Sequence, residues 1–199
     1  MTSCILLAAG LSSRFGSPKA LTKLHNITVI EHIQNTLINS NINEIVVVLG
    51  AHQKAINPYI YNHKKIISTF NADYELGQTS SFKTGLSIVS EESKNIFLLP
   101  VDYPLIKTET FNQIILSNQK NKSAITIPVF ESRRGHPPLF DISLKQNFLN
   151  LENTLGINSI FQSYQKSINL HTVNDPGVTQ TFNTPEEFRT LTKDLNQPT

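Results

Sequence analysis

Apolar and polar positions along the chain follow two different periods. Mostly apolar stretches occupy residues 3–8, 42–49, 65–70, 95–100 and 124–130, and each predicts a strand. Residues 42–49 form the clearest one, of the kind that helices cover on both faces of a parallel sheet. Apolar residues recur at helical spacing over 28–39, 80–89 and 108–119. The alternation of strands and helices predicts an α/β fold.

The pattern weakens after residue 131. A polar turn at 132–138 is followed by short helical pieces at 143–149 and 158–163 and by a strand at 168–173. The chain closes with Thr184, a helix N-cap, followed by a proline and two acidic residues that open a helix to about residue 195. A length of 199 residues suits one compact domain.

Composition excludes several classes of protein. The chain has 17 Lys and Arg against 15 Asp and Glu, far from the basic excess of a nucleic-acid-binding protein. Its longest aliphatic run, residues 45–49, is far shorter than the roughly 20 residues that span a bilayer. With no signal-peptide pattern, we expect a cytoplasmic protein with no nucleic-acid or membrane partner. The single cysteine, Cys4, lies in an apolar run and is expected to be a buried, inert thiol.

The segment after the first strand, residues 7–19, reads LAAGLSSRFGSPK and is the first candidate for chemistry. Small residues let backbone amides approach an anion, and Arg14 and Lys19 add mobile positive charge. This combination predicts a phosphate cradle, although the spacing is that of neither a Rossmann nor a Walker motif. An ordinary strand-to-helix loop with two surface cations is the alternative.

An acidic residue, Asp102, comes directly after the strand at 95–100 and lies between Pro100 and Pro104. Ligands of open α/β sheets collect at the carboxyl ends of the strands. A lone carboxylate there suits a Mg²⁺ ion that keeps several waters and takes phosphate oxygens as further ligands. A simple turn-forming role for Asp102 is the alternative.

Two polar segments complete the candidates from the residues themselves. The first, residues 71–81, ends at the start of a helix, whose free amides can bind an anion or the edge of a base or pterin. A ligand-free N-cap explains Thr79, Ser80 and Ser81 equally well. A cationic turn at 133–138 could hold an acceptor phosphate, or its arginines could be a solvated pair. Apart from His136 in this turn, the histidines are at positions 25, 32, 52, 63 and 171. Their spacing matches no metal-binding or catalytic motif, and we interpret them as surface or structural residues.

Together these segments resemble the MobA-like nucleotidyltransferases, most closely the branch that includes the molybdenum cofactor cytidylyltransferases. Residues 7–19 match the family pattern L-A-A-G-x-S-x-R-F-G-x-x-K at every fixed position. Asn71 with residues 77–82 resembles the substrate loop, and residues 100–104 are similar to the metal-binding D-x-P. Residues 135–137 resemble the G-H-P turn, and 183–187 the closing segment. The likeness covers nearly the whole chain in the expected order.

The resemblance implies a three-layer, Rossmann-like α/β fold whose mostly parallel sheet has helices on both faces. It implies one domain over 1–199, with a nucleotide-binding half at about 1–105 and an acceptor-binding half at about 106–199. The implied activity moves a nucleoside monophosphate from a triphosphate to the phosphate of an acceptor and releases pyrophosphate. The implied substrates are CTP and molybdenum-bearing molybdopterin, with Mg²⁺ or Mn²⁺ as cofactor and a molybdoenzyme as transient partner.

The resemblance also assigns residues. Arg14, Lys19 and Asp102 are the expected catalytic residues, and Asp102 and Asn183 the expected metal ligands. The expected nucleotide-binding set comprises Leu7, Ala8, Ala9, Gly10, Ser12, Ser13, Arg14, Lys19, Asn71, Gly77, Pro100 and Asp102. The expected acceptor-binding set comprises Thr79, Ser80, Ser81, Arg134, Gly135 and His136.

Three positions qualify this assignment. Asn183 stands where the cytidylyltransferase branch usually has a second metal carboxylate, and the amide oxygen offers itself to the metal or the nucleotide instead. Residues 155–159 lack the Asp and Arg of the family segment that follows the G-H-P turn. Ala9 replaces the glycine of guanylyltransferases, which favours CTP over GTP.

Three other functions remain open from the sequence. The acceptor could be a sugar phosphate or another alcohol phosphate. Similar chains include oxidoreductases that use NAD(P)H, although a dinucleotide-binding fingerprint is absent here. The altered positions could also mark a nucleotide-binding chaperone that delivers the cofactor without catalysis.

Overall fold

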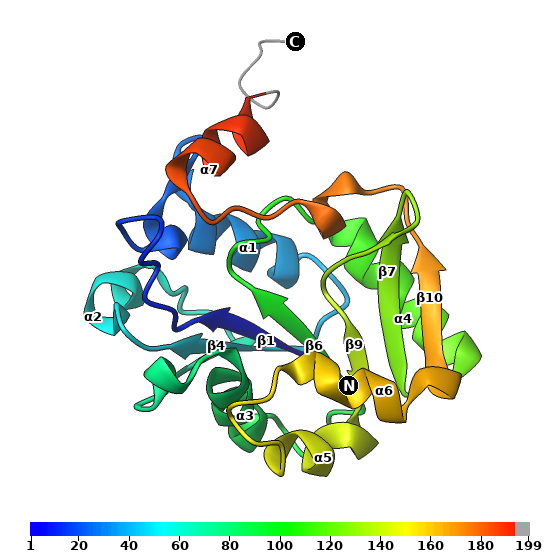
Figure 1. Ribbon diagram of the computed structural model, residues 1–199. Coiled ribbons are helices and arrows are strands. Elements are labelled where there is room, and N and C mark those ends of the chain that lie inside the picture. The colour runs from blue at the N-terminus through cyan, green and yellow to red at the C-terminus, as the bar shows by residue number, and fades with distance from the viewer. Residues whose placement is uncertain (194–199) are drawn as a thin grey trace.

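An eight-stranded, mostly parallel sheet forms the centre of the molecule in the computed structural model, which describes residues 1–193 (Figure 1). The spatial order is β10-β7-β9-β6-β1-β4-β5, with β8 paired to β7. The strands are β1 (Thr2–Ala8), β4 (Glu44–Leu49), β5 (Ile66–Phe70), β6 (Asn95–Pro100), β7 (Ile125–Phe130), β8 (Arg133–Arg134), β9 (Leu139–Asp141) and β10 (Ile168–Thr172). All six predicted strands are confirmed.

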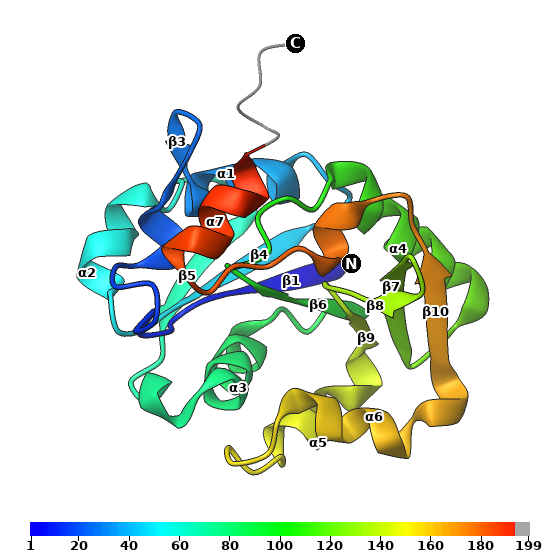
Figure 2. The ribbon, with the colours of Figure 1, turned by 45° about the horizontal axis from the view of Figure 1, so that its top comes forward.

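Helices cover both faces of the sheet, so the predicted three-layer α/β fold is confirmed (Figures 1 and 2). One face packs against α1 (Val29–Ile38), α4 (Thr108–Asn121) and α7 (Pro185–Thr192). The other packs against α3 (Gln78–Ile88), α5 (Lys145–Leu149) and α6 (Ile160–Ser163). Because successive side chains of a strand point to opposite faces, β1 sends Cys4 and Leu6 into the first core and Ile5 and Leu7 into the second.

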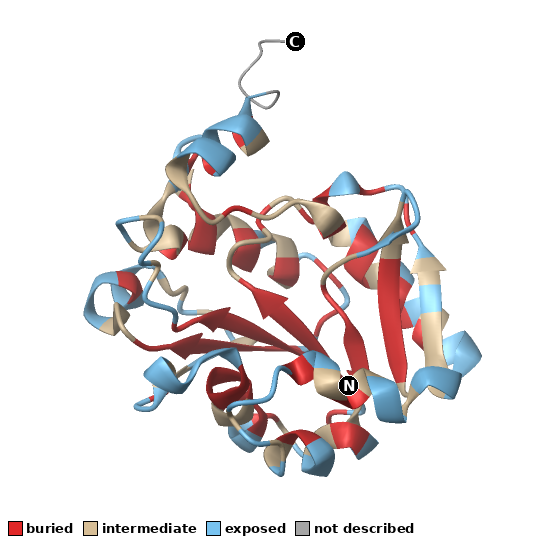
Figure 3. Cartoon of the chain, viewed as in Figure 1, coloured by how far each residue is buried: buried red, intermediate tan, exposed pale blue. Residues whose placement is uncertain are grey.

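Burial is greatest in the middle of the sheet (Figure 3). All residues of β1 and β4 are buried, whereas the edge strands β5 and β10 are partly exposed. Cys4 is fully buried, and burial raises the pKa of its thiol above the ordinary range, as expected of an inert structural cysteine. Within residues 1–193, no helix has the length and apolar character that crossing a membrane requires.

Several small elements were not predicted. A hairpin of β2 (Lys23–Leu24) and β3 (Ile27–Thr28) precedes α1, and the short helix α2 (Gln53–Ile56) follows β4. The strand β9 inserts between β6 and β7 and runs antiparallel to both. The helical period over 28–39 places Ile38 on the inward face, but the residue is only half-buried, at the margin of the first core. The predicted end of the last helix, at about residue 195, lies outside the described residues.

A segment that we call the C-terminal strap, residues 173–183, runs from β10 back across the carboxyl edge of the sheet to α7 (Figure 2). Asp175 fixes it: the buried carboxylate accepts hydrogen bonds from the Lys107 backbone N–H at 2.9 Å and the Thr110 hydroxyl at 2.6 Å. A Cβ on Gly177 would lie 2.3 Å from the Leu105 carbonyl oxygen, so only glycine permits this close approach. Farther along, the Phe182 backbone N–H donates to the Asp102 carbonyl oxygen at 3.3 Å.

Candidate active site

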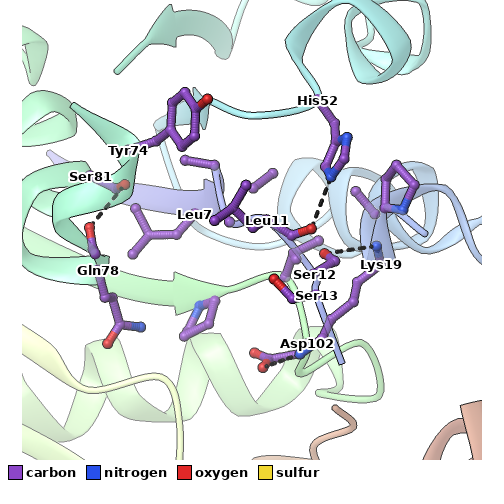
Figure 4. A pocket seen from close by; sticks show the side chains of 18 of the residues that line it. Leu7, Leu11, Ser12, Ser13, Lys19, His52, Tyr74, Gln78, Ser81 and Asp102 are labelled. Atoms are coloured by element: carbon purple, nitrogen blue, oxygen red, sulfur yellow. Dashed lines mark hydrogen bonds and ion pairs between the residues drawn. The ribbon is translucent and has the colours of Figure 1, made fainter. Parts of the chain in front are cut away.

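A cavity of about 410 Å³ opens at the carboxyl ends of β1, β4 and β6 (Figure 4). These strands are adjacent and parallel, so the segments that leave them meet at one edge of the sheet. Every residue of the predicted nucleotide-binding set except Asn71 lines the cavity, and Ser81 and Asn183 join them. The structure therefore brings together residues that lie up to 176 positions apart, from Leu7 to Asn183.

The loop after β1 is folded as an anion cradle. Ser12 has a left-handed backbone (φ 54°), and its carbonyl oxygen accepts the N–H groups of Phe15 and Gly16 at 2.9 and 3.1 Å. The Ser12 hydroxyl accepts the Lys19 backbone N–H at 3.3 Å. Within residues 1–193, no hydrogen bond engages the backbone N–H groups of residues 10–14. Those amides are available to phosphate oxygens.

Two cations converge beside the acidic residue. The Lys19 ammonium lies 3.2 Å from Oδ2 of Asp102 and 3.0 Å from Oδ1 of Asn183. Arg14 reaches the same Asn183 oxygen at 3.1 Å. The Lys19 side chain is only 12% exposed, and its ammonium lies 5.5 Å from the centroid of the Phe182 ring. The four polar groups thus form one cluster at the mouth of the cradle.

Asp102 offers an oxygen that suits a divalent cation. Its Oδ1 is buried and has no hydrogen-bond partner among the described residues, a state that costs free energy unless a ligand satisfies it. No group of three or more His, Cys, Asp or Glu side chains able to hold a metal occurs within residues 1–193. One carboxylate with phosphate oxygens and water is a donor set that Mg²⁺ accepts, so the residues present fit such an ion.

Several cavity residues were not predicted from the sequence. His52 was interpreted as a surface or structural residue, yet it lines the cavity and its Nε2 lies 3.0 Å from the Leu11 carbonyl oxygen (Figure 4). Tyr74 and Gln78, which lie in the predicted substrate segment but were assigned no role, also line the cavity. His52 could have been predicted from its place in the sequence, because it follows the carboxyl end of β4 and ligands of open α/β sheets bind at that edge.

Asn71 supports the site from outside the cavity. It is buried, and its amide nitrogen donates to the hydroxyls of Ser80 and Ser81 at 3.0 and 3.1 Å. Ser80 donates in turn to the Asp73 carbonyl oxygen at 2.9 Å. Thr79 donates to the Leu155 carbonyl oxygen at 2.7 Å. Of the three acceptor candidates at the start of α3, Thr79, Ser80 and Ser81, only Ser81 lines the cavity beside the cradle.

The remaining acceptor candidates line a second cavity, of about 720 Å³. Gly135 and His136 are held there by backbone hydrogen bonds, from the Gly135 N–H to Pro128 at 2.8 Å and from the His136 N–H to Val178 at 2.7 Å. The polar and aromatic lining consists of Tyr103, Arg134, Gly135, His136, Asn158, Phe161, Gln162 and Gln165.

Consecutive residues line the two cavities, Asp102 the first and Tyr103 the second. The rings of Tyr103 and His136 pack with centroids 4.4 Å apart. Burial lowers the pKa of His136, while the negative charge of Asp102 and a backbone hydrogen bond with Leu98 oppose the shift. Burial and the Asp102 charge raise the pKa of Tyr103. The charge of Asp102 therefore acts on both cavities.

Comparison with known proteins agrees with this geometry. The sequence model of the MobA-like NTP transferase domain matches residues 4–168. The chain belongs to this family. The molybdenum cofactor cytidylyltransferase of Escherichia coli (strain K12) is 31% identical over 137 residues, which cover 68% of each chain. A probable molybdenum cofactor guanylyltransferase of Bacillus cereus (strain Q1) is 30% identical over 65% of this chain and 62% of its own.

A third relative is named as an oxidoreductase and not as a transferase. The nicotine blue oxidoreductase of Paenarthrobacter nicotinovorans is 29% identical over 147 residues, 71% of each chain. Among solved structures, Rv0371c from Mycobacterium tuberculosis H37Rv gives a TM-score of 0.83 at 21% identity over 96% of this chain and 97% of that one. Its complex with manganese gives 0.80 at 19% identity, with the same coverage. These structures show the Rossmann-like fold.

Proposed function

We propose that the protein transfers a nucleoside monophosphate from CTP to the phosphate of molybdenum-bearing molybdopterin and releases pyrophosphate. The observation that carries this proposal is the cluster of Lys19, Arg14 and Asp102 at the mouth of a loop with free amides. Family membership supports the reaction class, and the cytidylyltransferase and guanylyltransferase relatives support the acceptor.

The chain's own groups can perform most of this chemistry by alignment and charge neutralisation. The amides of residues 10–14 bind the phosphates, and the Lys19 ammonium and Arg14 guanidinium meet the negative charge that develops on the leaving pyrophosphate. Asp102 would hold a divalent cation, Mg²⁺ or Mn²⁺, which when bound screens phosphate charge. An acceptor phosphate is already ionised at neutral pH, so no general base is required.

We place the acceptor in the second cavity. Arg134, an exposed cation, would bind its phosphate, and Tyr103 and His136 would lie between the acceptor and the nucleotide. Residues 7–102 with Asn183 line the first cavity and residues 103–170 the second, which supports a division into a nucleotide-binding and an acceptor-binding half near residue 105. A molybdoenzyme would then receive the product.

Ala9 supports a pyrimidine nucleotide. It is buried in the wall of the cavity, and its carbonyl oxygen accepts the Ala51 N–H at 3.1 Å. A Cβ on Gly50 would lie 2.8 Å from the Ala9 methyl and 2.7 Å from the Tyr74 Cβ, so the wall is closely packed there. We propose that this packed wall, with the Ala9 methyl in it, leaves too little room for a purine.

Pyrophosphate release tests the function. The protein is incubated with Mg²⁺, molybdenum-bearing molybdopterin and each of CTP, GTP, ATP and UTP. We expect release with CTP that depends on the acceptor. Release with a sugar phosphate in place of molybdopterin would redirect the acceptor assignment, and tight CTP binding with no release under any condition would indicate a cofactor chaperone.

The relative named nicotine blue oxidoreductase supports a second candidate, an oxidoreductase acting on a pigment. We take NAD(P)H as the reductant to be tested. Consumption of NAD(P)H, followed by its absorbance in the presence of a quinonoid dye, separates this activity from nucleotidyl transfer. We expect no consumption, because the loop after β1 lacks the glycine spacing of a dinucleotide site.

A further inference from the structure

The amide oxygen of Asn183 is shared by two cations. Oδ1 accepts a hydrogen bond from Nη2 of Arg14 at 3.1 Å and from Nζ of Lys19 at 3.0 Å. A carbonyl oxygen has two lone pairs, and both are engaged here. A divalent cation at this oxygen would have to displace one of the two side chains, and the remaining positive charge would repel it.

Asn183 is held in place independently of these cations. Its backbone N–H donates to Oε2 of Glu187 at 2.5 Å, the carboxylate that also closes the capping box with Thr184 at the start of α7. The preceding residue, Phe182, is fully buried and packs edge-to-face against Phe15 with ring centroids 5.5 Å apart. The backbone of Asn183 is therefore fixed, and from it the side-chain amide presents Oδ1 to Arg14 and Lys19.

The arrangement leaves donors for a ligand. An ammonium has three N–H donors, and that of Lys19 donates two hydrogen bonds, to Asp102 and Asn183, which leaves one donor for a ligand. Arg14 has five guanidinium N–H donors, is exposed, and contacts Asn183 through Nη2. On the acidic side, the buried Oδ1 of Asp102 is the carboxylate oxygen at the cluster that has no partner among the described residues.

We propose that Asn183 is a positioning residue for Lys19 and Arg14 and not a ligand of the divalent cation. Asp102 is then the one protein ligand in the cluster, and the metal binds as a complex with the polyphosphate. This inference replaces the expectation, drawn from the sequence, that Asn183 ligates the metal. It rests on the proposed function and deepens it.

Two binding measurements on purified protein test the proposal. The first titrates Mn²⁺ without nucleotide and follows free Mn²⁺ by electron paramagnetic resonance. Asn183→Ala should bind Mn²⁺ within about twofold of the parent, Asp102→Asn should lose the binding, and Asn183→Asp should bind roughly tenfold more tightly because it adds a carboxylate. Asn121→Ala, an exposed asparagine of α4, is the matched control.

The second measurement follows tripolyphosphate binding in EDTA by calorimetry. Asn183→Ala should weaken it by roughly tenfold, because both cations lose the acceptor that fixes them. Thermal unfolding followed by circular dichroism verifies that each variant is folded, and Asn183→Ser provides a second truncation of the amide.

Either measurement can overturn the proposal. A loss of Mn²⁺ affinity in Asn183→Ala equal to that of Asp102→Asn would make Asn183 a metal ligand. Unchanged tripolyphosphate binding in Asn183→Ala would remove its positioning role. Failure of the proposed function gives a different result, namely a parent protein that binds Mn²⁺ and tripolyphosphate as expected but forms no pyrophosphate from any triphosphate.

Discussion

At the scale of single residues, the site depends on three charged side chains, those of Arg14, Lys19 and Asp102. Lys19 is nearly buried and lies against an aromatic ring, an acid and an amide, so its ammonium is positioned before any ligand arrives. Such preorganisation is what electrostatic stabilisation of a transition state requires, since the group need not reorganise as charge develops.

Lys19→Ala should lower kcat by about 10²-fold or more if the ammonium meets charge chiefly in the transition state. Steady-state kinetics with CTP as the varied substrate gives kcat and KM separately. An unchanged kcat with a raised KM would instead make Lys19 an anchor of the ground state.

Asp102→Asn should lower turnover by at least about 10²-fold while the fold is retained, because the variant removes the charge that would hold the divalent cation. Pyrophosphate release and circular dichroism measured on the same sample test this. Asp141→Asn is the control, since within residues 1–193 the Asp141 carboxylate accepts a hydrogen bond only from the Ser143 backbone N–H. Full activity of Asp102→Asn would remove the residue from the mechanism.

Ala9→Gly should shift preference toward GTP, because it removes the methyl group from the packed wall near Gly50 and Tyr74. The ratio of kcat/KM for CTP and GTP measures the shift, and removal of one methyl is worth roughly tenfold in such a ratio. A ratio equal to that of the parent would place base selection elsewhere in the cavity.

At the scale of elements, the C-terminal strap completes the site by bringing a residue from the end of the chain to the loop after β1. Asp175 ties it to the segment before α4, and Phe182 ties it to Asp102. The strap thereby carries Asn183 to the cradle, although more than 160 residues separate them in sequence.

Asp175→Asn should destabilise the protein by about 1–3 kcal/mol and raise the KM for CTP. An amide nitrogen would face N–H donors of Lys107 or Gly177, leaving a buried polar group without an acceptor. Urea unfolding and steady-state kinetics give the two effects. Asp141→Asn again serves as the control, and an unchanged KM in a destabilised Asp175→Asn protein would limit Asp175 to a structural role.

The sequence predicted those features of the fold and the site that depend on residues close together in the chain, and it missed those that depend on distant contacts. The strands and the cradle loop were predictable, because β-branched runs and the segment LAAGLSSRFGSPK act within a few residues. The strand β9 was missed since three residues give no period, and its place is fixed by pairing with β6 and β7. The strap was missed because Asp175 acts through Thr110, 65 positions away.

At the scale of the whole molecule, two histidines couple folding to pH. Burial lowers the pKa of His32 from its ordinary value of 6.5, the positive charge of His25 lowers it further, and a backbone hydrogen bond with Pro104 opposes the shift. Burial also lowers the pKa of His136 from 6.5. Between pH 6.5 and the lowered values, the unfolded chain binds more protons than the folded protein.

The free energy of unfolding should therefore decrease as pH falls below 6.5 and should level off below the folded-state pKa values of the two histidines. Glu31, whose pKa is lowered from 4.5 by hydrogen bonds with Thr28, adds a separate loss of stability below pH 4.5. Urea unfolding from about pH 8 to about pH 5 measures the first effect alone. His32→Gln and His136→Gln should each flatten the slope, and the double variant should flatten it most. A slope that neither variant changes would show that other groups carry the pH dependence in this range.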